Sequence, residues 1–181
     1  MAGHASEPLD SVQDSEVEPP EATVARPSVY LETSIVSYLV ARPSRDLVVA
    51  GHQQVTVAWW EEVLPLVDCF VSPFVIQEAS RGDQAVARRR LEKIETFPVL
   101  EVNETVGGLA QEYFDAMAIP EKSRIDAFHL AMAVSYRIDY LLSWNCRHIA
   151  SGRVQKLLQR INSRMKIHTP VLCTPEELME I

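Results

Sequence analysis

Residues 29–39, VYLETSIVSYL, decide the fold of this chain. The first three residues form a short apolar run that is typical of a buried strand, and residues 35–40 follow at once with a helical pattern. Thr33 and Ser34 can cap the start of that helix. Glu32 stands between the strand and the helix, where the chain should be buried. A carboxylate in such a place needs a partner, so Glu32 is the first candidate functional residue.

The rest of the chain alternates between short apolar runs and amphipathic stretches. Besides 29–31, we expect strands at 69–71, 98–102, 139–143 and 171–173, with helices between them and a last short helix from 175. In the helix expected over 46–63, helical spacing fits Trp60 to the core stripe, and packing in a dimer is an equal alternative for it. Alternation of this kind is typical of a parallel sheet with helices on both faces. The sequence therefore predicts a three-layer α/β/α fold around a central, mostly parallel five-stranded sheet.

Residues 1–27 differ in composition from the rest. They hold six acidic residues, one basic residue and no apolar periodicity, so we expect a disordered acidic tail followed by one domain over 28–181. The tail supplies −5 of the formal net charge of −8, which leaves −3 for the domain. Within the domain, residues 147–166 contain six bases and no acid, and residues 88–90 are three consecutive arginines. Both runs are either phosphate contacts or solvated helix faces.

Several classes of protein are excluded. No run of about 18 uncharged apolar residues is present, so no membrane span is expected. The three cysteines form no CxxC pair, which speaks against a zinc ribbon or a disulfide framework and favours the cytoplasm. Neither GxGxxG nor GxxxxGK[ST] occurs, which argues against dinucleotide and P-loop enzymes.

Four polar residues fall where a parallel sheet binds ligands, beyond the carboxyl ends of its strands. They are Glu32, Glu78, Asp126 and Asn145. Carboxylates that converge raise one another's pKa, and a divalent cation reverses that effect. Oxygen ligands of this kind suit Mg²⁺ or Mn²⁺. Taken singly, Asp126 can also be a helix-start acid and Glu78 a solvated residue on a helix flank.

Four segments resemble PIN domains. VYLETSIVSYL (29–39), VSPFVIQEAS (71–80), DAFHLAMAV (126–134) and YLLSWNCRHI (140–149) are similar, in this order, to the motif regions of that family. The resemblance extends over residues 28 to about 180 and is greatest to VapC-type toxins, the ribonucleases of bacterial toxin–antitoxin pairs. It implies Mg²⁺- or Mn²⁺-dependent cleavage of RNA, a homodimer and inhibition by a cognate antitoxin protein.

The resemblance also assigns roles to residues. Glu32, Glu78 and Asp126 match the first, second and third acids of the family, which makes them the expected metal ligands. Asn145 lies where many members have a fourth Asp, and these four residues are the expected catalytic set. Two departures matter, because Glu32 is one methylene longer than the usual Asp and Asn145 is neutral. They keep open an alternative, a catalytically weakened module that binds RNA or a protein partner without cleavage.

Other residues near the expected site have weaker claims. Three arginines are candidate contacts to RNA phosphates: Arg42, Arg45 and Arg147. Three hydroxyl residues are candidates for orienting water or substrate: Thr33, Ser34 and Ser143. For Thr33 and Ser34, helix capping is the simpler expectation. His129 lies beside apolar residues, so we expect a buried, hydrogen-bonded histidine and not a catalytic base.

Overall fold

The sheet is parallel throughout. The computed structural model describes residues 25–180, so the expected tail lies almost wholly outside the described residues. Four strands pair in the order β2-β1-β3-β4: β1 (Ser28–Leu31), β2 (Asp68–Phe70), β3 (Tyr140–Leu142) and β4 (Val171–Cys173). Every pairing between them is parallel. The parallel sheet predicted from the alternating pattern is confirmed, but the prediction of five strands is wrong.

The segment 98–102 is the expected strand that does not form. It meets the sheet only at an isolated bridge between Val99 and Val71, just beyond β2. Val99 and Val102 are 48% and 46% exposed. Pro98 has no N–H to donate to a ladder. Because these valines remain exposed, pairing of the segment with the sheet would bury little apolar surface. The segment therefore forms one bridge to the sheet and no strand.

Seven α-helices connect and cover the strands in the described residues. They are α1 (Thr33–Val40), α2 (Leu47–Glu62), α3 (Pro73–Ala79), α4 (Gln84–Ile94), α5 (Glu104–Ala116), α6 (Arg124–Ser135) and α7 (Gly152–Met165). Short 3₁₀ turns occur at Leu64–Leu66 and Glu121–Ser123. The expected helix from 175 is wrong, because residues 175–178 form only turns. So few residues cannot offset the cost of helix nucleation.

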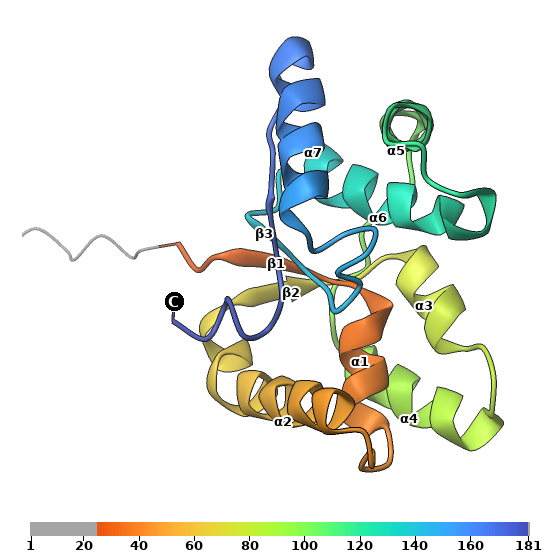
Figure 1. Cartoon of the computed structure of the whole chain (residues 1–181), viewed down its shortest axis with the longest axis vertical. Coiled ribbons are helices and arrows are strands. Elements are labelled where there is room, and N and C mark those ends of the chain that lie inside the picture. Colours follow the sequence, from red (N-terminus) through yellow and green to blue (C-terminus); the bar gives the residue numbers. More distant parts are fainter. Residues whose placement is uncertain (1–24, 181) are drawn as a thin grey trace, which may run out of the picture.

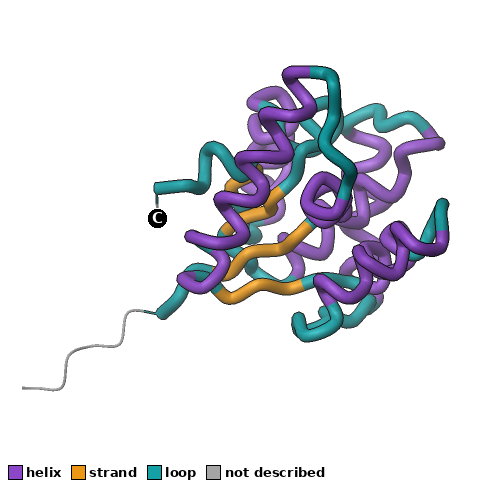
Figure 2. The backbone as a smooth tube through the Cα atoms, turned by 90° about the horizontal axis from the view of Figure 1, so that it is seen from below, coloured by secondary structure: helices purple, strands orange, loops and turns teal. Residues whose placement is uncertain are grey.

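The helices form layers on the two faces of the sheet. In Figure 1, α5, α6 and α7 lie on one side of the strands and α1, α2 and α4 on the other, with α3 near the edge where the strands end. The turned view in Figure 2 shows the strands enclosed by helices. The sheet with helices on both faces is thus as predicted. No helix within residues 25–180 has the length and apolar character needed to cross a membrane.

The core tryptophan of α2 is Trp59. Its side chain is fully buried, whereas Trp60 is only partly buried against Phe97. Trp60 thus packs against the core as predicted, but Trp59, about 100° away around the helix, is the fully buried residue, which the spacing did not predict. The helical spacing was counted from Leu47 as a buried residue, but Leu47 is 89% exposed.

Candidate metal and nucleic-acid site

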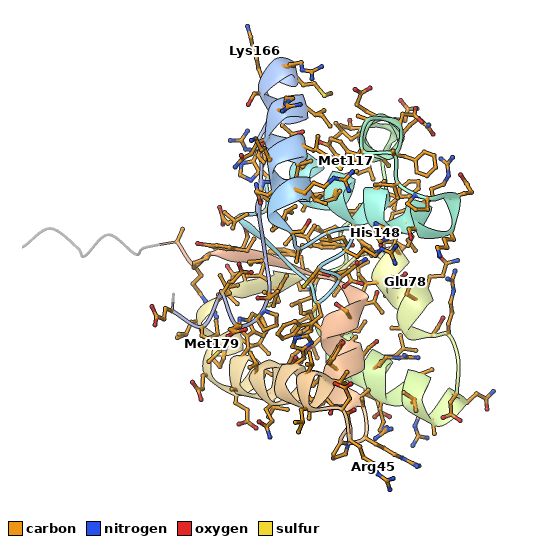
Figure 3. The ribbon with its side chains drawn as sticks, in the orientation of Figure 1. Arg45, Glu78, Met117, His148, Lys166 and Met179 are labelled. Carbon is orange, nitrogen blue, oxygen red and sulfur yellow. The ribbon has the colours of Figure 1, made fainter. Side chains whose placement is uncertain are left out.

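The carboxyl edge of the sheet gathers the polar residues. Glu32 follows β1 directly, and its backbone N–H extends the β1–β3 ladder by donating to the Leu142 carbonyl at 3.0 Å. Asn145 follows β3 by three residues, and Asp126 lies in the first turn of α6, the helix that precedes β3. α3 carries Glu78 to the same region. Figure 3 labels Glu78 on α3 and His148 on the turn after β3.

Glu32 is held by two serines. Its Oε2 accepts a hydrogen bond from Ser143 Oγ at 2.7 Å and another from Ser34 Oγ. Ser34 Oγ in turn accepts from the Trp144 backbone N–H at 2.8 Å, and Ser143 Oγ accepts from the Asn145 N–H at 2.9 Å. The Glu32 side chain is 7% exposed, so these donors replace the water that the carboxylate has lost. The turn after β3 thereby fixes the orientation of Glu32.

Glu78 is held by a chain of buried groups. Its Oε2 accepts from Thr33 Oγ1 at 2.6 Å and from His129 Nε2 at 3.0 Å. His129 Nδ1 lies 2.8 Å from the Tyr30 hydroxyl, which lies 2.6 Å from Ser72 Oγ. Tyr30, Ser72 and His129 are fully buried. We call the series Ser72–Tyr30–His129–Glu78 the buried relay, and it links the core of the sheet to the site.

The relay shifts the pKa values of its members. Burial would raise the pKa of Glu78, but the hydrogen bond and charge of His129, with the Thr33 hydroxyl, outweigh burial and lower it. Burial would lower the pKa of His129, yet the hydrogen bond to Glu78 and the charges of Glu32, Glu78 and Asp126 raise it. Burial raises the pKa of Tyr30, which stays a neutral phenol. Glu78 is therefore an anion, and Nε2 of His129 donates to it.

Asp126 is paired with Asn145. The Asn145 Nδ2 donates to Asp126 Oδ1 at 3.1 Å, and Asn145 Oδ1 accepts from the His148 backbone N–H at 3.1 Å. Burial raises the pKa of Asp126, and the Glu32 charge adds to the rise, against lowering by His129, His148 and Asn145. A buried carboxyl group with a raised pKa, such as that of Asp126, is suited to exchange a proton with a group bound beside it.

The donor set fits a divalent cation. Glu32, Glu78 and His129 each offer a ligand atom, and these atoms lie within 4.8 Å of one another. Asp126, expected as the third ligand, is not part of this close group, and His129 was not expected in it. Because His129 Nε2 donates a hydrogen bond to Glu78, this nitrogen orients a carboxylate and has no lone pair available to bind a metal ion. Two carboxylate oxygens suit Mg²⁺ or Mn²⁺, with water completing the coordination.

The hydroxyl residues do not act as helix caps. Glu32 occupies the N-cap position of α1 without a side-chain cap hydrogen bond. Thr33 and Ser34 instead donate to Glu78 and Glu32, so the expectation of capping is wrong. Ser143 is fully buried and donates to Glu32. Thr33 and Ser34 lie inside the first turn of α1, after the N-cap position, and their O–H groups make the strong hydrogen bonds that charged acceptors form.

The arginines lie at different distances from the carboxylates. Arg147 is exposed in the turn that contains Asn145. Arg42 and Arg45 are exposed beyond the far end of α1, about 12 Å from Glu32 by the rise of that helix. In Figure 3, Arg45 lies well apart from Glu78. Of the three, Arg147 is therefore placed nearest to the site.

The histidine expectation was correct as far as it went. His129 is buried and hydrogen-bonded, as predicted. Its link to Glu78, and the roles of Tyr30 and Ser72, were missed. The relay joins β1, α3 and α6, and no spacing along the sequence reports such contacts across the fold.

Known structures share this fold. A VapBC2 structure from Rickettsia felis, described as bound to a promoter DNA fragment, aligns at a TM-score of 0.52 and 11% identity, covering 81% of this chain and 98% of that chain. VapC20 of Mycobacterium tuberculosis, described as a sarcin–ricin loop cleaving toxin, aligns at 0.52 and 16%, covering 66% and 92%. VapBC-1 of nontypeable Haemophilus influenzae aligns at 0.51 and 17%, covering 82% and 98%. No family model and no curated protein matches the sequence.

These alignments confirm the fold that the sequence motifs implied. The chain has a VapC-like PIN fold, and nearly the whole length of each matched chain is represented in it. At identities of 11–17%, the likeness extends to the fold and no further. The chemistry of this chain must therefore be argued from its own residues.

Proposed function

We propose that this protein is a divalent-metal-dependent endoribonuclease of the VapC-like type, which hydrolyses phosphodiester bonds in RNA. The observation that carries the proposal is the convergence of Glu32 and Glu78 at the carboxyl edge of the sheet, each oriented by two donors. Asp126 is linked to the same edge through Asn145, whose side chain donates to Asp126 Oδ1 and whose backbone N–H donates to the serine that holds Glu32. One similar structure is described as a sarcin–ricin loop cleaving toxin, which supports RNA as the substrate class.

The residues divide the work of hydrolysis. Mg²⁺ or Mn²⁺, when bound, supplies Lewis-acid activation of water and neutralises the charge that develops on the phosphate. Glu32 and Glu78 would hold the cation, and Thr33, Ser34 and Ser143 keep these two carboxylates in place. Asp126 accepts the proton of the attacking water, for which its raised pKa is suited.

Asn145 and the arginines complete the proposed site. The Asn145 amide orients Asp126 and leaves the second oxygen of that carboxylate for water. Arg147, beside the site, and Arg42 and Arg45, at the end of α1, neutralise phosphates of the bound RNA. Thr33 and Ser34 can also orient the attacking water, whereas the fully buried Ser143 acts through Glu32.

We further propose a cognate antitoxin protein and a second copy of this chain as partners in the cytoplasm. Two of the similar structures are described as VapBC assemblies, which supports the antitoxin. We assign these activities to residues 28–181; the acidic segment 1–27 lies almost wholly outside the described residues.

Cleavage of a labelled structured RNA tests the activity. We expect products with Mn²⁺ or Mg²⁺, none with EDTA, and a loss of at least a hundredfold in Asp126→Asn, which keeps the size of the side chain but cannot accept the proton. A thermal unfolding curve of the variant controls for folding. Undiminished cleavage by Asp126→Asn would show that the products come from another nuclease or another site.

A second candidate function rests on Asn145. Where a fourth carboxylate would add charge, a neutral amide donates to Asp126 and occupies one of its oxygens. That arrangement favours a module that binds RNA or a protein partner without cleavage. Titration with Mn²⁺ separates the two candidates, because the nuclease requires the metal site and the binding module does not.

A further inference from the structure

One face of α7 is uniformly basic. Four exposed residues on that face form what we call the α7 stripe: Arg153, Lys156, Arg160 and Arg164. At 3.6 residues per turn they lie within about 80° of the helix circumference, and the first and last are about 16 Å apart along the axis. The opposite face is the buried one, with Val154, Leu158 and Ile161 in the core. α7 contains no acidic residue.

The stripe residues lack ion pairs in the described part of the chain, whereas two of the three consecutive arginines on α4, Arg88 and Arg90, have partners. Within residues 25–180, no ion pair involves any of the four stripe residues. On α4, Arg88 pairs with Glu92 at 3.2 Å. Arg90 donates to the Ala79 carbonyl at 3.0 Å and to the Arg81 carbonyl. The contacts thus separate two arginine-rich segments that look equivalent in the sequence.

A groove runs beside the stripe. Arg153, Lys156 and Arg160 line a cavity of about 490 Å³ with Leu157 and with residues 116–118 at the end of α5. The Tyr113 hydroxyl donates to Asn162 Oδ1 at 2.7 Å and holds α5 against α7. Figure 3 shows Met117 in the space between these two helices. The lining has three cations and no acid, so the groove attracts anions.

The stripe begins beside the proposed cleavage site. The Asn145 carbonyl accepts from the backbone N–H groups of Ile149 at 2.9 Å and Ala150 at 3.0 Å, so the turn after β3 folds back on Asn145. α7 starts two residues later, and Arg147 lies within the same turn. From there α7 leads away from the sheet edge to Lys166 at its tip (Figures 1 and 3).

We propose that the α7 stripe binds the sugar–phosphate backbone of the RNA strand that extends from the cleavage site. This inference rests on the proposed function, and it adds the path of the strand and the residues that follow it. Regularly spaced cations match a polymer with one negative charge per nucleotide. Phosphate contacts of this kind set affinity and register, while other contacts choose the base sequence.

An acidic protein partner is the less favoured occupant. Protein interfaces have an apolar core surrounded by a polar rim. On α7 the one large exposed apolar side chain is Met165, at the end far from the site. A row of charges without an apolar centre is the pattern of a nucleic-acid surface.

Salt dependence of RNA binding tests the proposal. A fluorescent single-stranded RNA of about 30 nucleotides is titrated in EDTA, where cleavage does not interfere, at several KCl concentrations between 50 and 200 mM. The stripe variant R153Q/K156Q/R160Q is compared with R88Q/R89Q/K93Q, which removes three charges from α4 and leaves Arg90 in place. Each lost phosphate contact lowers the slope of log K against log[salt] by about 0.7.

The expected result is specific to α7. In the stripe variant, the slope of log K against log[salt] falls in magnitude by about 2. The loss of RNA affinity relative to the wild type is therefore about 20-fold larger at 50 mM than at 200 mM KCl. The α4 variant changes the slope by less than about 0.7, one contact. Equal slopes for the wild type and the stripe variant, or equal losses in both variants, overturn the proposal. Thermal unfolding shows whether both variants are folded. We expect that they are, because the substituted residues are exposed.

The same proteins separate this inference from the proposed function. In the presence of Mn²⁺, the stripe variant should retain cleavage of a short RNA and lose the advantage that the wild type shows with a long one. Binding with the predicted slope but without cleavage by any protein contradicts the nuclease and leaves the stripe intact. Cleavage with an unchanged slope contradicts the stripe and leaves the nuclease intact.

Discussion

Replacement of Tyr30 by Phe isolates the buried relay. The substitution removes one oxygen from a fully buried side chain and leaves the ring. That oxygen lies 2.6 Å from Ser72 Oγ and 2.8 Å from His129 Nδ1, so two hydrogen bonds disappear at once. Each buried partner left without a hydrogen bond costs about 1–3 kcal/mol. Ser72 Oγ still accepts a long hydrogen bond of 3.5 Å from the Val75 N–H, which reduces the cost of losing its bond to Tyr30.

We therefore expect Tyr30→Phe to lower the free energy of unfolding by about 2–4 kcal/mol. Urea denaturation followed by circular dichroism measures the loss. Ser72→Ala supplies the partner for a double-mutant cycle, because it deletes one of the two groups that Tyr30→Phe strands. The double variant should be more stable than the sum of the single losses predicts, by about 1 kcal/mol.

A small effect would refute the reasoning. If Tyr30→Phe costs less than about 0.5 kcal/mol, the value typical of a surface substitution, the relay does not stabilise the fold. The relay should also reach the site through His129. We expect Mn²⁺ affinity to fall about tenfold in Tyr30→Phe, as is typical when a group that orients a ligand is lost. An unchanged affinity would confine the role of Tyr30 to stability.

Three further perturbations probe the carboxylates. Ser143→Ala removes the 2.7 Å hydrogen bond to Glu32, so Mn²⁺ affinity measured by calorimetry should fall about tenfold; an unchanged affinity would mean that Glu32 needs no such support. Asn145→Asp places a second negative charge beside Asp126, so thermal unfolding should show lower stability in EDTA and a larger gain on adding Mn²⁺; equal gains would contradict the proximity of this pair to the metal. His129→Gln removes one partner of the His129–Glu78 pair. The raised pKa of His129 stabilises the fold below pH 6.5, and this contribution is lost as pH rises through the pKa of the folded state. The lowered pKa of Glu78 stabilises the fold above pH 4.5, and this contribution is lost as pH falls through the pKa of the folded state. The stability advantage of the wild type over His129→Gln, from urea denaturation, should therefore be largest between pH 4.5 and 6.5, and a pH-independent difference would argue against the ion pair.

The elements nearest the site were the most predictable from sequence. The strand–Glu–helix pattern at 29–40 has local causes, an apolar run followed at once by helical spacing, and it forms as expected. The segment 98–102 failed because apolar and β-branched composition signals burial, whereas Val99 lies in solvent here. The last expected helix failed because a cap followed by Pro also begins an ordinary turn. Composition reports a preference, and tertiary contacts decide the outcome.

The site was predictable as a set of residues and not as a set of contacts. Glu32 and Asn145 could be placed at one edge because parallel strands end together. The distances that separate a close group of Glu32, Glu78 and His129 from a nearby Asp126–Asn145 pair depend on the packing of α3 and α6. A hydroxyl next to a helix start predicts a cap, yet Thr33 donates to Glu78. Such choices depend on contacts between distant segments, which a single sequence does not contain.

Binding of Mn²⁺ tests the central claim most directly. Free Mn²⁺ is followed by its electron paramagnetic resonance signal during titration of the wild type and of Glu78→Gln, with R88Q/R89Q/K93Q as a folded control that leaves the site intact. We expect the wild type and the control to bind one Mn²⁺ per chain, and Glu78→Gln to bind it at least tenfold more weakly. Absence of binding at millimolar Mn²⁺, or equal binding by wild type and Glu78→Gln, would contradict a metal-dependent site at this edge of the sheet.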